Sequence, residues 1–247
     1  MNVREELYRL FCLPKCVSCA KPLARGENVL CENCRIRFRD ESVRDCSFCF
    51  QKICECSCTP KAFKSDRIKH LFKISRYNTK SEDSPTKGLI FSLKHDNYST
   101  VFAYIAELLS ERLRKHYAND SDKLVLIPIP RRRKNVIKYG YDHAAVLAKR
   151  MSKLLRCEYQ PILKSLAKVD QKGLTREQRQ ENARFALKKK TSFENKTVIF
   201  IDDVVTSGAS MTSAADVIRE LKPAAISGAC LAISYRDIDL NANLPLE

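Results

Sequence analysis

Apolar residues change their spacing along this chain of 247 residues near residue 60. Before that point they are scattered among cysteines and polar residues. After it, short apolar runs alternate with longer segments in which apolar residues recur every three or four positions. The short runs are typical of buried strands and the longer segments of amphipathic helices. The change predicts two regions, a cysteine-rich module over residues 1–62 and an α/β domain over residues 63–247.

The second region is expected to alternate strands with helices. Strands are predicted at residues 68–77, 124–129, 198–201 and 225–233. Helices are predicted at residues 88–95, 101–116, 141–155 and 211–221. Such an alternation forms a parallel sheet with right-handed crossovers and helices on both faces. Ligands of such sheets bind beyond the carboxyl ends of the strands, so the segments that follow the strands are the candidates for a site.

The composition suits a folded protein with anionic partners. Hydrophobic residues make up 44% of the chain, which is enough for a packed core. No apolar run approaches the ~20 residues that span a bilayer, and the N-terminal residues lack an apolar export segment. We therefore expect a cytoplasmic protein without membrane insertion. The formal net charge of +16 favours phosphate-rich partners, although an ordinary solvated surface can carry the same charge.

Ten of the twelve cysteines lie before residue 59. In a cytoplasmic protein, this density favours metal binding over disulfide bonds. Two Cys-x2-Cys pairs supply the four thiolates of a tetrahedral zinc site, and they are Cys16, Cys19, Cys31 and Cys34. Four thiolates leave no open position for water, so a structural role is expected. A module of about 60 residues with so few apolar side chains needs such a staple.

Five further cysteines suggest a second zinc site. Cys46 and Cys49 form another Cys-x2-Cys pair, and Cys54, Cys56 and Cys58 follow it. Because four ligands complete the shell, one of the last three cysteines is spare. The spacing does not decide which one.

A phosphate site is predicted after the strand at residues 198–201. Asp202 and Asp203 follow this strand directly, and Thr-Ser-Gly-Ala-Ser at residues 206–210 leads into the next helix. Backbone N–H groups, hydroxyls and a helix N-terminus at such a turn can bind one phosphate. Gly208 allows the backbone to approach that phosphate closely. The two acids stand where they can hold sugar hydroxyls or a hydrated Mg²⁺.

Nucleotide-binding motifs of different classes fit this segment less well. A strand that ends in Asp-Asp also occurs in P-loop ATPases, but the chain has no Gly-x4-Gly-Lys-Ser/Thr motif. The dinucleotide motif Gly-x-Gly-x-x-Gly is absent as well. A simple capped helix would explain one hydroxyl but not the paired acids.

The run from Val198 to Ser210 resembles the phosphoribosyl-pyrophosphate (PRPP) signature of type I phosphoribosyltransferases. Further segments resemble the ComF family of competence-associated, amidophosphoribosyltransferase-like proteins. These are the N-terminal cysteine pairs, Gly88–Lys94, Pro128–Arg132, Gly140–Ala144 and Gln171–Phe185. Asp142 and His143 stand where that family usually has Asn and Gln.

This resemblance implies a type I phosphoribosyltransferase-like fold behind a zinc-ribbon-like module, with PRPP and Mg²⁺ as ligands. The acid pair would bind the ribose hydroxyls and help to place Mg²⁺, and the turn would hold the 5′-phosphate. Arg131 and Arg132 would face pyrophosphate, and the loop at residues 171–182 would bring Arg176 over the site. The implied PRPP-binding residues are Asp202, Asp203, Val204, Val205, Thr206, Ser207, Gly208, Ala209 and Ser210.

Two functions follow from these features. The first is an enzyme that transfers phosphoribosyl from PRPP to a nitrogen nucleophile, with Asp202, Asp203, Arg131, Arg132 and Arg176 as its catalytic residues. The alternative, also implied by the resemblance, is a single-stranded-DNA-handling protein that works with the DNA-uptake machinery of natural transformation. Tyrosines beside the arginines, at positions 139 and 141, suit base stacking. A shared fold does not decide between the two functions.

Overall fold

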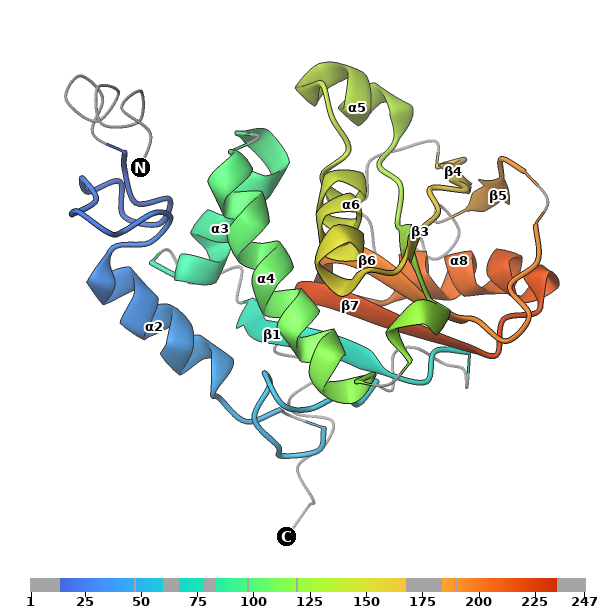
Figure 1. Cartoon of the computed structure of the whole chain (residues 1–247). Helices are drawn as coiled ribbons and strands as arrows, with labels where there is room; N and C mark the ends of the chain where they lie inside the picture. Colours follow the sequence, from blue (N-terminus) through green and yellow to red (C-terminus); the bar gives the residue numbers. More distant parts are fainter. Residues whose placement is uncertain are drawn as a thin grey trace, which may run out of the picture.

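The computed structural model describes residues 14–46, 48–59, 67–77, 83–96, 98–118, 120–167, 184–189 and 191–234. Its centre is a five-stranded sheet in which neighbouring strands run parallel (Figure 1). In order across the sheet, the strands are β1 (Leu71–Tyr77), β7 (Ala225–Ser234), β6 (Thr197–Val205), β2 (Leu124–Pro128) and β3 (Glu158–Tyr159). The predicted parallel sheet is therefore confirmed.

Helices cover both faces of this sheet, as the alternation of strands and helices predicted. One face packs against α3 (Pro85–His95), α4 (Ser99–His116) and α6 (His143–Leu155). The other face packs against α8 (Ala209–Ile218), which lies behind the sheet in Figure 1. Within the described ranges, every helix is too short or too polar to span a bilayer.

Strand β6 shows why the apolar runs form the centre of the sheet. Val198 and Phe200 pack into the core on the α8 side, and Ile199 and Ile201 pack into the core on the opposite side. All four side chains are fully buried. A strand covered on both faces needs apolar residues at every position rather than at alternate ones.

Strand β6 is longer than the sequence predicted. The apolar run suggested an end at residue 201, but the strand continues through Asp202 and Asp203 to Val205. The neighbouring strand explains the extension, because β7 pairs with β6 over its whole length, up to Val205 opposite Ile233. The acid pair therefore lies within the last half of a central strand and does not follow it.

Several described elements were not predicted. Helix α2 (Glu32–Ser42) begins directly after Cys31 and carries Cys34, and helix α5 (Arg133–Tyr139) occupies the basic segment after β2. Strands β4 (Leu163–Ser165) and β5 (Phe185–Leu187) form a separate antiparallel pair. Two 3-10 turns of three residues each, η2 (Ser121–Lys123) and η3 (Arg219–Leu221), complete the described elements. Only three of the 11 residues of α2 are buried, so its apolar pattern is weak.

The first cysteine pair packs directly against helix α3. Leu23 and Phe38 of the module share one hydrophobic core with Leu89 and Leu93 of α3. The closest approach is at Gly88, where an added Cβ atom would lie 2.6 Å from the carbonyl oxygen of Val17. Real Cβ atoms essentially never come so close to backbone, so glycine sets the distance between the module and α3.

This close approach generates a prediction for Gly88→Ala. In an isolated helix, alanine would be more favourable than glycine by about 1 kcal/mol. Here the added methyl group meets fixed backbone, so we expect a net destabilisation of about 1–3 kcal/mol, typical of overpacking. Urea unfolding of wild type and variant measures this difference.

Lys87→Ala, one position earlier in α3, is the matched control, because Lys87 is only half-buried and its substitution adds no atoms. A Gly88→Ala protein as stable as the wild type would show that the module and α3 are not in this close contact.

Candidate functional site

The acid pair of β6 lies in two different environments. Asp203 is buried, with 4% of its surface exposed, whereas Asp202 is half-buried. The backbone N–H of Asp203 donates a hydrogen bond of 2.9 Å to Oδ1 of Asp202. The side chain of Asp202 is thereby turned back toward its neighbour, so both carboxylates serve one site.

Two basic side chains from the helices in front of the sheet meet Asp203. Nζ of Lys94, in the last turn of α3, lies 2.9 Å from Oδ2 of Asp203. Nε2 of His143, the first residue of α6, lies 3.3 Å from Oδ1. Burial alone would raise the pKa of Asp203, but the positive charge of Lys94, aided by the neighbouring His143, lowers this pKa well below its usual value.

Asp202 has the opposite behaviour. Burial raises its pKa well above the value of an ordinary aspartate, and the negative charge of Asp203 raises it further. In turn, the charge of Asp203 raises the pKa of Lys94. The site therefore combines a buried carboxylate that is already paired with a carboxyl group that is half-buried and carries no ion pair among the described residues.

The turn after β6 has the backbone form expected of a phosphate cradle. Gly208 is the residue before α8 and adopts the left-handed conformation, with φ at +73°. Residues with a Cβ atom adopt this conformation at a cost, which explains the glycine. Helix α8 begins at Ala209, two residues before its predicted start, so its N-terminal N–H groups stand at the carboxyl end of β6. Partial positive charge at a helix N-terminus favours a phosphate there.

Arg131 lies at the same edge of the sheet. Its backbone N–H donates to Asp142 (2.9 Å), and its Nη2 donates to the carbonyl oxygen of Lys94 (3.1 Å). Its guanidinium group stacks 4.6 Å from the ring centre of Tyr139. The remaining Nη1 is buried and has no hydrogen-bond partner among the described residues. Arg131 is therefore held in place by its other contacts, and this one guanidinium nitrogen is left without a partner in the described part of the chain.

Val204 and Val205 end strand β6, and Ala209 and Ser210 begin helix α8. Arg132 is the residue before α5 and is half-buried. Thr206 is exposed, and Ser207 is half-buried with its Oγ 3.5 Å from the N–H of Ala209. Arg176 and the whole loop at residues 171–182 lie outside the described residues.

Neither Lys94 nor His143 was among the predicted site residues, although His143 was noted as a departure from the ComF pattern. Neither lies in the segment that carries the acid pair, so the contact with Asp203 arises from tertiary packing. The one signal for Lys94 was its place in the Gly88–Lys94 segment, which resembles the ComF family without an assigned role.

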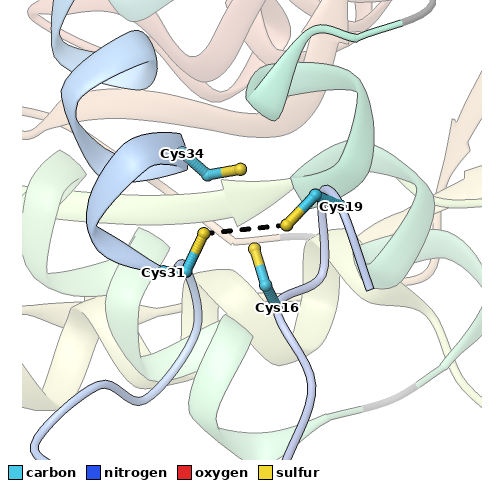
Figure 2. A group of neighbouring side chains, drawn as sticks. All are labelled: Cys16, Cys19, Cys31 and Cys34. Atoms are coloured by element: carbon cyan, nitrogen blue, oxygen red, sulfur yellow. Dashed lines mark hydrogen bonds between the residues drawn. The ribbon is translucent and has the colours of Figure 1, made fainter. Parts of the chain in front are cut away.

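The first four cysteines converge in space. Figure 2 shows the side chains of Cys16, Cys19, Cys31 and Cys34 around one point. Their sulfur atoms lie within 4.8 Å of one another, and Sγ of Cys19 is 3.6 Å from Sγ of Cys31. Zinc–sulfur bonds of about 2.3 Å place tetrahedral sulfurs about 3.8 Å apart. The spacing thus fits a tetrahedral metal ion and is far longer than a disulfide bond.

A second group of four forms from Cys46, Cys49, Cys56 and Cys58, whose sulfur atoms also lie within 4.8 Å of one another. Sγ of Cys58 lies 3.5 Å from that of Cys46 and 3.8 Å from that of Cys56. Cys54 is not part of this group. The structure thereby selects one of the arrangements that the sequence left open, and both groups are consistent with structural zinc.

Together, a parallel sheet, an acid pair on its central strand and a glycine turn into a helix define an α/β protein with a candidate phosphate site at the end of that strand. The family model of the phosphoribosyl transferase domain matches residues 97–238, which is more than half of the chain. The chain therefore belongs to the phosphoribosyl transferase domain family.

Two curated relatives confirm the resemblance to the ComF family. Competence protein F of Haemophilus influenzae is 24% identical over 223 residues, which cover 84% of this chain and 91% of the relative. DNA utilization protein YhgH of Escherichia coli is 24% identical over 153 residues, which cover 60% of this chain and 66% of the relative. The chain thus spans slightly less than two thirds of YhgH.

Among solved structures, the chain is similar to a purine phosphoribosyltransferase from Pyrococcus horikoshii, with 18% identity and a TM-score of 0.34. The match covers 53% of this chain and 72% of that protein. A likeness this weak carries no conclusion about function.

The two cysteine groups generate a prediction about metal content. We expect purified protein to contain two zinc ions per chain, because each group supplies a complete set of four ligands. Cys56→Ser should lose one zinc ion, whereas Cys54→Ser should keep both. Elemental analysis of the three proteins measures the difference.

The two variants make the same chemical change two residues apart, so each controls for the other. Wild-type protein without zinc would contradict the metal assignment. Equal loss from both variants would contradict the choice of ligands.

Proposed function

We propose that this protein binds PRPP together with Mg²⁺ and transfers the phosphoribosyl group to a nitrogen nucleophile. One observation carries the proposal, the acid pair on β6 followed by the glycine turn into α8. This arrangement offers groups for sugar hydroxyls and for a phosphate within one short segment. Membership of the phosphoribosyl transferase domain family supports the same ligand.

The donor atoms of the site fit a magnesium ion. Ligand atoms of Asp202, Asp203 and His143 lie within 4.8 Å of one another, and carboxylate oxygens are ligands that Mg²⁺ prefers. Asp202 would be the main ligand, because Lys94 already neutralises Asp203. Bound with PRPP, Mg²⁺ would neutralise charge that develops on the departing pyrophosphate.

The chain's own residues would bind and orient the substrate. The acid pair would accept hydrogen bonds from the ribose hydroxyls, and the turn at Gly208 would hold the 5′-phosphate. The bond from the ribose anomeric carbon to pyrophosphate breaks, and pyrophosphate leaves with the electron pair. A bond from the nucleophile nitrogen to the same carbon forms, and the nitrogen releases its proton to water. Arg131 would stabilise the leaving group through its free Nη1 donor. On the basis of the resemblance to the ComF family, Arg132 is proposed for the same task and Arg176 for a catalytic place over the site.

A second function, handling of single-stranded DNA, has its own supporting observation. Helix α5 presents exposed Arg133, Lys134 and Lys138 beside the stacked pair of Arg131 and Tyr139. Basic side chains that track phosphates, next to aromatic rings that stack on bases, are typical of single-strand binding surfaces. The names of the two relatives, a competence protein and a DNA utilization protein, agree with this alternative.

The enzyme proposal predicts the effect of Asp202→Asn. This variant removes the half-buried carboxylate and leaves the ion pair of Lys94 and Asp203 in place. We expect Mg²⁺-dependent PRPP affinity to fall about 10- to 100-fold, because hydrogen bonds to charged groups contribute about 1.5–3 kcal/mol. Gly208→Val should also block binding, since the left-handed turn cannot accommodate a β-branched residue without strain. Calorimetry measures both affinities.

Asp122→Asn, on an exposed 3-10 turn, is the control for the loss of one carboxylate. Asp203→Asn is a poorer test, because it leaves Lys94 facing a buried neutral group and is expected to destabilise the fold. Unchanged PRPP affinity in Asp202→Asn would refute the assignment of the site.

The DNA proposal predicts a change in salt dependence. Each phosphate contact contributes a slope of about −0.7 to log K against log salt for single strands. Replacing Arg133, Lys134 and Lys138 with alanine should therefore reduce the magnitude of the slope by about two units. Arg131 is kept in this test because its contacts hold the site together. Binding titrations with an oligonucleotide at several salt concentrations measure the slope.

The control replaces three exposed basic residues outside α5 with alanine, and it removes the same amount of positive charge. These residues are Arg44, Lys149 and Lys189. An unchanged slope in the α5 variant would show that single-stranded DNA binds to a surface other than α5. Absence of binding at low salt would leave the enzyme as the better proposal.

A further inference from the structure

Strand β1 carries a lysine in the interior of the protein. Lys73 is fully buried, at 0% exposure, in the middle of β1. Its position is in register with Cys230 of β7, and Cys230 is in register with Asp202 of β6. Lys73 therefore lies in the same row of the sheet as the acid pair, two strands away.

The ammonium group of Lys73 points to the second cysteine group. Nζ donates a hydrogen bond of 2.9 Å to the carbonyl oxygen of Cys58 and lies 3.7 Å from Sγ of the same residue. A further contact, of 3.4 Å, reaches the carbonyl oxygen of Leu71. Carbonyl oxygens satisfy hydrogen bonds, but they carry no net charge.

A buried cation without a nearby anion costs several kcal/mol. No carboxylate in the described part of the chain forms an ion pair with Lys73. The sulfur atoms of the second group are the nearest candidates for the missing negative charge. Neutral thiols or disulfides would not supply it, whereas four thiolates around a divalent metal ion carry a net charge of about −2.

We propose that Lys73 is the counter-charge of a metal–thiolate centre formed by Cys46, Cys49, Cys56 and Cys58. This assignment goes beyond the proposed function, because it links the metal to the sheet. With the metal bound, Lys73 offsets one of the two excess negative charges of the centre. Without the metal, the net negative charge of the metal–thiolate centre is lost. The buried ammonium group of Lys73 then has no opposite charge beside it. Loss of the second metal ion should therefore destabilise the sheet that carries the acid pair.

The test compares the full-length protein with Lys73→Met, which keeps the length of the side chain and removes its charge. In the zinc-loaded state, the variant should be less stable, and the affinity of one of the two zinc ions should fall about 10- to 100-fold, as for other groups that support metal ligands. In the chelator-treated state, the variant should be more stable than the wild type, because it has no unpaired buried ammonium. Thermal melting in both states and zinc transfer to a chelator measure these effects.

Lys69→Met removes the same charge from an exposed position shortly before β1, and it should change neither quantity. The reversal of sign between the loaded and metal-free states is the result that supports the proposal. An equal loss of stability in both states, with unchanged zinc affinity, would overturn it and leave Lys73 as a packing residue.

A second measurement tests the coupling between Lys73 and the second cysteine group directly. Cys49→Ser breaks the second group, and its cost can be compared in the wild-type and Lys73→Met backgrounds by a double-mutant cycle. The proposal predicts a smaller cost in the Lys73→Met background. Equal costs in the two backgrounds would overturn it.

Discussion

The ion pair between Lys94 and Asp203 is the interaction on which the candidate site depends. A carboxylate on a central strand is expensive to bury unless an opposite charge reaches it. Lys94 reaches it from the last turn of α3, and α3 is placed by its contact with the first cysteine pair at Gly88. The cysteine module thus helps to position a site that lies far from it along the sequence. The first cysteine group therefore shares one hydrophobic core with the helix that carries Lys94, even though the composition changes near residue 60.

Strands and helices whose buried residues recur at regular spacing could be predicted from the sequence. The strands at the centre of the sheet are apolar at every position because both faces are covered, and the helices show the expected spacing. The cysteine pairs and the turn around Gly208 could also be predicted, because each depends on the spacing of residues that are close together in the sequence. Helix α2 was not predicted, because only Cys34, Phe38 and Ser42 are buried along it. The end of β6 at Val205 was not predicted either, because pairing with β7, and not an apolar run, extends the strand.

The contacts that give the site its chemistry could not be predicted in the same way. Lys94 and His143 come from two different helices, and neither helix reveals in its own sequence which carboxylate it will face. The contact of Lys73 with the second cysteine group could not be predicted for the same reason. The spacing also did not show that Cys56 joins this group and Cys54 does not, because that depends on how the chain folds around them. Such pairings depend on the relative placement of elements, which spacing along one element does not encode.

Arg131 connects the two proposed functions. Its guanidinium group is shared between the carbonyl oxygen of Lys94, on the side of the acid pair, and the ring of Tyr139, on the side of α5. A ligand that takes up the free Nη1 donor would draw on the same side chain that a stacked base would approach through Tyr139. PRPP and single-stranded DNA would then occupy neighbouring rather than identical surfaces, joined at one residue.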